Sequence, residues 1–242
     1  MVESFLWGLL AAGSLLVGAF IAFNRAPGQR TVGLVMGFGS GVLLSAVSFE
    51  LVVPAMAGGD GVAGAALGFF VGAATFTVGD ILIGRFAARQ ARGGGEATAS
   101  SGLSIVLGAL LDGVPETAVL GLTLLQTGQV GVTMLVAVFV SNIPEAIAAT
   151  TGLIKGGWRR SSIVGLWCVV VFASASAAAL GYVFLDGAGP STLGFIYAFA
   201  AGAILTMLAT SMIPEAYEKA GRAVGFVTVL GYAVAFGIDA IS

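Results

Sequence analysis

The sequence predicts an all-α integral membrane protein with eight transmembrane helices in a 3+2+3 arrangement, with inverted repeats and both termini outside. Three observations lead to this prediction: the composition, the recurrence of apolar windows and the placement of the basic residues. The 242-residue chain is 58% hydrophobic and 9% charged, with a mean hydropathy of +1.05. A soluble protein of this length could not cover so much apolar surface, so the bilayer is expected to be its solvent.

Eight hydrophobic windows, each about long enough to cross a bilayer, follow one another along the chain. They cover residues 4–23, 32–55, 61–84, 102–125, 129–154, 162–184, 191–214 and 223–241. Because they leave no room for a folded extramembrane domain, residues 1–242 are expected to form a single transmembrane domain. The first window is not expected to be a signal peptide, because it follows the acidic stretch MVES.

All ten basic residues fall in alternate connections between these windows. They are Arg25, Arg30, Arg85, Arg89, Arg92, Lys155, Arg159, Arg160, Lys219 and Arg222. Basic residues gather in cytoplasmic loops, so these four connections are expected in the cytoplasm and both termini on the outer side. The longest of them, residues 85–101, contains many Gly and Ser residues and is expected to be a flexible loop.

Two parts of the chain resemble each other. GFGSGVLLS (37–45) in the second window is similar to AFAAGAILT (198–206) in the seventh, and VVPAM (52–56) matches MIPEAY (212–217) after a slip of one residue. The second and seventh windows are expected to run in opposite directions. Spans one to three and six to eight are therefore predicted to be inverted repeats around spans four and five, as in secondary transporters. Chance similarity between Gly-rich apolar helices is the alternative.

The fourth and fifth windows each contain a proline–glutamate pair, in LDGVPET and VSNIPEA. Positions i and i+4 share one face of a helix, so Asp112 is expected beside Glu116 and Ser141 beside Glu145. A rise of about 1.5 Å per residue places both sets near the bilayer centre at matching depth. Each proline also frees a backbone carbonyl four residues earlier, which can donate its oxygen to an ion or to water.

No window core contains a lysine or arginine that could neutralise these acids. An ionised carboxylate at a helix centre costs at least ~2.5–3.5 kcal/mol. The carboxyl groups are therefore either protonated and hydrogen-bonded between helices, or ligands of a cation. The chain has no histidine and one cysteine, so the donors are oxygens that suit Mg²⁺, Mn²⁺, Fe²⁺ or Ca²⁺, with zinc not excluded.

Five further acids extend the candidate ion pathway toward both membrane surfaces. Glu50 and Asp239 are expected toward the outer end of their spans, and Asp80, Glu215 and Glu218 toward the inner end. Each of them taken alone could instead be a snorkelling residue near an interface.

Taken together, the chain resembles the ZIP (Zrt/Irt-like) family of divalent metal transporters. DGVPET and SNIPEA carry the resemblance, and SFELVVPAM in span two and GDILIGR in span three are also similar to the family's patterns. The resemblance implies that Glu116 and Glu145 are core metal ligands. Asp112 and Ser141 then occupy the usual histidine and histidine-or-glutamine positions, with Asn142 beside them.

The resemblance also implies a function. The chain is expected to be a carrier in the cell membrane that moves divalent cations such as zinc, iron or manganese into the cytoplasm. The cation is then a transported substrate, and no cofactor or enzymatic activity is expected. The expected partners are divalent metal ions and the lipid bilayer, without nucleic acid, and a homodimer is left open.

Several positions depart from the family pattern. Gly113 replaces an asparagine, and the sixth span offers only Ser174 and Ser176 where many members have a glutamate. Because both histidine positions have also changed, a non-transporting or proton-coupled homologue that binds no metal is the alternative function. Intramembrane hydrolysis by two aspartates is disfavoured, because TVGD lacks the first glycine of the G-x-G-D element and Asp80 and Asp112 are expected at different depths.

Overall fold

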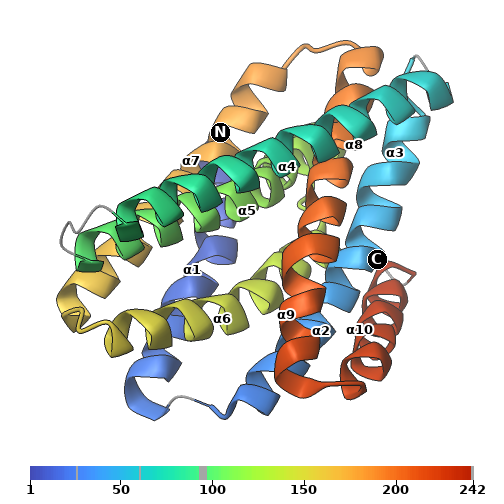
Figure 1. The fold of residues 1–242 in the computed structure, drawn as a ribbon. Coiled ribbons are helices and arrows are strands. Elements are labelled where there is room, and N and C mark those ends of the chain that lie inside the picture. Colours follow the sequence, from blue (N-terminus) through green and yellow to red (C-terminus); the bar gives the residue numbers. More distant parts are fainter. Residues whose placement is uncertain (26, 60, 93–96, 241–242) are drawn as a thin grey trace.

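The computed structural model of the chain describes residues 1–25, 27–59, 61–92 and 97–240, and it contains no strand in these ranges (Figure 1). Side chains are described for these residues except 90–92 and 97–103. The elements are α1 (Val2–Arg25), α2 (Gln29–Ala46), the π-helical turn η1 (Val47–Val52), α3 (Val53–Met56), α4 (Gly61–Arg92), α5 (Ala97–Thr127), α6 (Val132–Lys155), α7 (Arg160–Leu185), α8 (Pro190–Met207), the π-helical turn η2 (Leu208–Met212), α9 (Ile213–Ala220) and α10 (Ala223–Asp239).

Seven helical segments in the described part of the chain are long and apolar enough to cross a bilayer. They coincide with the first seven windows of the sequence, and two of them are composite. One of these joins α2, η1 and α3 over 28 residues, and the other joins α8, η2 and α9 over 31 residues. The eighth window forms α10, which is apolar but has only 17 residues. These lengths and compositions identify a multi-pass membrane protein.

The prediction of a flexible loop over residues 85–101 is largely wrong. Helix α4 continues to Arg92 and α5 begins at Ala97, so most of this connection is helical. The sequence RFAARQAR at the end of α4 consists mostly of strong helix formers, and no proline interrupts it. The side chain of Arg92, one of the ten basic residues used for the orientation, lies outside the described residues.

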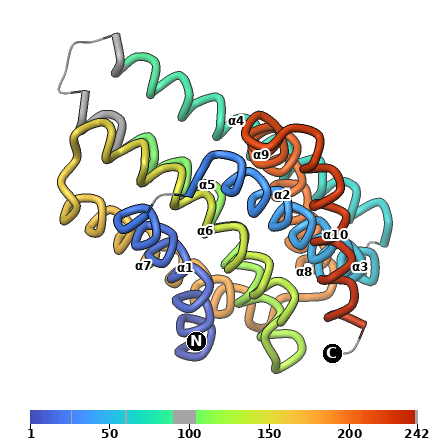
Figure 2. The backbone as a smooth tube through the Cα atoms, turned by 90° about the horizontal axis from the view of Figure 1, so that it is seen from below, coloured from blue at the N-terminus to red at the C-terminus, as the bar shows by residue number. Residues whose placement is uncertain are grey.

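The helices pack in two sets (Figure 2). In one set, α4 packs along α8, and α10 packs along α2. In the other set, α7 packs along α5 and α1, and α1 also packs along α6. The two sets meet mainly where α2 contacts α6, so these two helices bring residues of both sets together.

Glycines allow the backbones of α4 and α8 to touch. A Cβ at Gly72 would overlap the backbone carbonyl of Phe199, and a Cβ at Gly202 would overlap the carbonyl of Phe69. The two glycines therefore lie on opposite sides of one contact, each facing the backbone of the other helix. Small residues at such positions permit close helix approach in a membrane, where packing replaces the hydrophobic effect as the driving force.

The contact between α2 and α10 has the same construction. A Cβ at Gly41 would overlap the carbonyl of Thr228, and a Cβ at Gly231 would overlap the carbonyl of Phe38. In addition, the hydroxyl of Thr228 donates a hydrogen bond of 3.0 Å to the carbonyl of Gly37. The two glycine-mediated contacts are thus equivalent in their backbone geometry.

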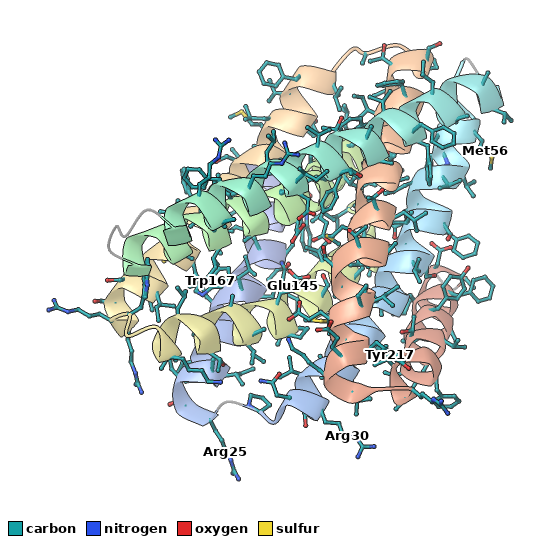
Figure 3. The ribbon with its side chains drawn as sticks, viewed as in Figure 1. Arg25, Arg30, Met56, Glu145, Trp167 and Tyr217 are labelled. Carbon is teal, nitrogen blue, oxygen red and sulfur yellow. The ribbon has the colours of Figure 1, made fainter. Side chains whose placement is uncertain are left out.

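The segments α2–η1–α3 and α8–η2–α9 match in length and irregularity. Helices α2 and α8 both have 18 residues, and the π-helical turns that follow them have six and five residues. This difference of one residue coincides with the slip between VVPAM and MIPEAY. Figure 3 shows the first segment running from Arg30 to Met56 and the second ending near Tyr217, at the Arg30 end, so the two run in opposite directions.

Candidate functional site

A cavity of about 380 Å³ lies in the middle of the bundle, between residues of both helix sets. Three carboxyl groups line it: Asp112 from α5, Glu145 from α6 and Glu215 from α9. Glu145 points into the interior between α6 and α8 (Figure 3). Because a water molecule takes up about 30 Å³ in the liquid, the cavity has room for several waters or a hydrated ion.

The carboxyl groups of spans four and five lie close to one another. Glu116, one turn after Asp112 on α5, is buried with 2% of its surface exposed. Asp112 and Glu116 both lie within electrostatic reach of Glu145 on α6, and so does Glu215. Two antiparallel helices joined by the short connection 128–131 thus bring these acids together.

Asp112, Glu145 and Glu215 line the cavity without converging on one point, and Glu116 is buried outside its wall. Among the residues that the structure describes, no three of the Asp, Glu and Cys side chains are close enough to hold a metal ion between them. A cation in this cavity would therefore be held by fewer than three carboxylates in this conformation. Water would complete its coordination shell, as is usual for hard cations such as Mg²⁺.

Ser141 and Asn142 are buried but engaged elsewhere. The hydroxyl of Ser141 donates a 3.1 Å hydrogen bond to the carbonyl of Val138, and its Cα lies 3.1 Å from where a Cβ on Gly39 would stand. The amide of Asn142 donates a 3.4 Å hydrogen bond to the carbonyl of Ala11 on α1. The structure therefore does not bring these two side chains to the cavity, and their role as ligands stays a prediction.

Glu50 lies in η1 and contacts the start of α6. One of its carboxylate oxygens, Oε1, accepts a 3.0 Å hydrogen bond from the backbone amide of Met134. A Cβ on Gly131, the residue before α6, would overlap the carboxyl group. Glu50 thus caps the N-terminus of α6, where the first amides lack helical partners and the helix dipole favours negative charge. It links the two helix sets.

The remaining predicted pathway acids do not line the central cavity. Asp80 is exposed on α4 but lies within electrostatic reach of Asp112. Glu218 is exposed on α9, and Asp239 is partly buried at the end of α10, within electrostatic reach of Glu50. The structure thus groups Asp80 with the central acids and Asp239 with Glu50, while Glu218 stands apart.

Sequence reasoning missed the apolar part of the cavity wall. Met36, Met207 and Met212 line it together with Trp167, whose indole N–H donates a 2.9 Å hydrogen bond to Thr150. Thioethers are soft donors, so the expectation of a purely oxygen-lined site is incomplete. The only sequence signal was the presence of methionine in spans two and seven, which also contain Glu50 and Glu215. An apolar residue in a membrane helix does not reveal which way it points.

A scan against protein-family models and a search of curated proteins both find no match to this chain.

Proposed function

We propose that this protein is a secondary transporter, similar to ZIP-family carriers, that moves divalent metal cations such as zinc, iron or manganese across the cell membrane into the cytoplasm. The observation that carries the proposal is the central cavity. It lies inside a bundle of apolar helices, and carboxyl groups from three helices line it. Carboxyl groups attract a cation, and the space leaves room for part of its hydration shell.

The charge balance around the cavity supports a cationic substrate. Within the described residues, the one salt bridge is that between Lys219 and Glu215. Asp112, Glu116 and Glu145 therefore have no basic partner, although they lie close to one another. Like charges in a low-dielectric region repel strongly, and a divalent cation between them would relieve that repulsion.

Alternating access is proposed to follow the pseudo-symmetry of the chain. The matching segments α2–η1–α3 and α8–η2–α9, together with the equivalent glycine contacts of α4 with α8 and α10 with α2, support inverted repeats around spans four and five. In this 3+2+3 arrangement, with both termini outside, one helix set moves relative to the other. The capping contact between Glu50 and α6 would have to break in that movement.

One observation favours the alternative, a homologue of the same fold that binds no metal. In this conformation the described acids form no three-residue metal group, and Ser141 and Asn142 donate to backbone carbonyls. A carrier of protons, or a protein that does not transport, would need no more than these carboxyl groups.

Uptake of ⁵⁴Mn²⁺ into proteoliposomes tests the proposal. We expect Glu145→Gln and Glu116→Gln to abolish uptake while the protein remains folded, because each removes a central carboxylate and keeps the side-chain shape. Glu218→Gln is the matched control, since Glu218 is exposed on α9 outside the cavity. Uptake by both central variants at the wild-type rate would refute the central site, and an uptake of protons without metal would support the alternative.

A further inference from the structure

A cationic side chain of the protein itself lies beside one end of the central cavity, against an acid that lines it. Lys219 on α9 donates to the carboxylate of Glu215 one helical turn earlier, and the two form a salt bridge. Glu215 lines the central cavity, where it lies within electrostatic reach of Glu145. Of the three acids that line this cavity, Glu215 is thus the one whose charge is neutralised by a side chain.

Lys219 also lines a second, smaller cavity of about 210 Å³. This cavity lies between the start of α2, the end of α6 and α9, and its wall includes Lys155. Glu215 and Ala148 line both cavities, so the two spaces adjoin at these residues. Figure 3 places Tyr217 of α9 at the same end of the bundle as Arg25 and Arg30, which is the basic end of the protein.

The position of Lys219 is fixed by tight packing. A Cβ on Gly33 of α2 would lie 2.7 Å from the Cβ of Lys219 and 2.9 Å from the carbonyl oxygen of Ala216. Helix α9 therefore lies directly on α2 at this point, and the lysine side chain emerges beside the smaller cavity. The packing fixes the base of the side chain, and the salt bridge with Glu215 holds the ammonium group.

From this arrangement we infer that Lys219 is a tethered competitor for the transported cation, which keeps the affinity of the inner end of the cavity low and so promotes release. The inference rests on the proposed function. A divalent cation that leaves Glu145 for Glu215 meets a carboxylate that an ammonium already occupies, and it must displace that ammonium to bind there. An exit without this competitor would hold the cation between Glu145 and Glu215, because two carboxylates bind a divalent ion more strongly than one.

An ordinary helix-stabilising pair would behave differently. A Glu–Lys pair four residues apart contributes little to stability, so if Lys219 only stabilised α9, its removal would change Mn²⁺ affinity no more than the removal of another lysine at the same small cavity. Mn²⁺ affinity separates the two roles when Lys219 is compared with Lys155, which lines the same small cavity and also contributes a positive charge.

The test is the equilibrium binding of Mn²⁺ to the purified protein in nanodiscs, with free Mn²⁺ measured by electron paramagnetic resonance. We expect Lys219→Met to bind Mn²⁺ at least about tenfold more tightly, because a positive charge next to a binding carboxylate is removed. Lys155→Met is the matched control: this lysine lines the same small cavity but forms no salt bridge within the described residues. Lys219→Arg keeps the charge and should bind Mn²⁺ as the wild type does.

The double variant Lys219→Met/Glu215→Gln should return the affinity to near the wild-type value, which shows that the lysine acts through Glu215. Suppose that the wild type binds Mn²⁺ and that Glu145→Gln abolishes this binding. If Lys219→Met then has the same Mn²⁺ affinity as Lys155→Met, this inference alone is overturned. Absence of Glu145-dependent binding in both the wild type and Lys219→Met overturns the proposed function as well. If Lys219→Met does not fold, Lys219→Gln gives the same comparison.

Discussion

Replacing Gly202 with alanine should destabilise the protein, although alanine is the better helix former. A Cβ at this position would overlap the carbonyl of Phe69 and lie 3.0 Å from its Cα, so α4 and α8 must move apart. Overpacking of this kind costs about 1–3 kcal/mol. The lower backbone entropy of alanine in the unfolded chain offsets about 0.5–1 kcal/mol of that cost. The net loss is therefore about 0–2.5 kcal/mol, with a central value near 1 kcal/mol.

Gly165 provides the matched control. It lies in the interior of α7, is exposed, and has no atom within 4 Å of the position its Cβ would occupy. Gly165→Ala should leave the stability unchanged or raise it by up to about 1 kcal/mol. Reversible unfolding in mixed micelles with SDS, followed by circular dichroism, measures both variants. Equal stability of Gly202→Ala and Gly165→Ala would refute the backbone contact between α4 and α8.

Two further predictions concern metal choice and the cap of α6. Asp112→His should raise the ratio of Zn²⁺ to Mn²⁺ affinity, because an imidazole is a softer donor than a carboxylate; competition binding measures this ratio, and an unchanged ratio would mean that Asp112 does not contact the ion. Glu50→Ala should lower the free energy of unfolding by about 0.5–2 kcal/mol, because the amide of Met134 loses its acceptor at the N-terminus of α6. Gly131→Ala should act in the same direction, since its Cβ would displace the Glu50 carboxyl group. Wild-type stability in both variants would argue against the cap.

The positions of the helices could be predicted from the sequence, because each window must span about 30 Å of hydrocarbon and its ends are marked by polar residues. The two proline–glutamate elements were also informative. Acids in the interior of apolar helices are rare enough to mark a site, and the short connection 128–131 makes α5 and α6 neighbours.

The orientation of small polar side chains could not be predicted in the same way. Sharing a helix face with Glu145 does not direct Ser141 into the cavity, because a serine hydroxyl in a helix can bond to a carbonyl of its own preceding turn. The cavity-lining methionines were missed for a related reason: periodicity separates apolar from polar faces, and it carries little information when nearly every face is apolar. The end of α4 and the start of α5 were missed because the Gly and Ser residues of this connection were taken to indicate a loop. The strong helix formers at the end of α4 received too little weight in that prediction.

The unequal ends of the two matching segments bear on the direction of the proposed transport. Pro54 is followed by Ala55 and α3 ends at Met56, whereas Pro214 is followed by Glu215 and α9 continues to Ala220. If the halves descend from one inverted duplication, the two ends of the ancestral protein were identical, and neither direction across the membrane was favoured. The acid and the extra helical turn after Pro214 break that symmetry, as does Glu50, which has no counterpart in η2. A cation in the cavity would then meet a different chemical environment at each exit, and these residues would contribute to the direction of the proposed transport.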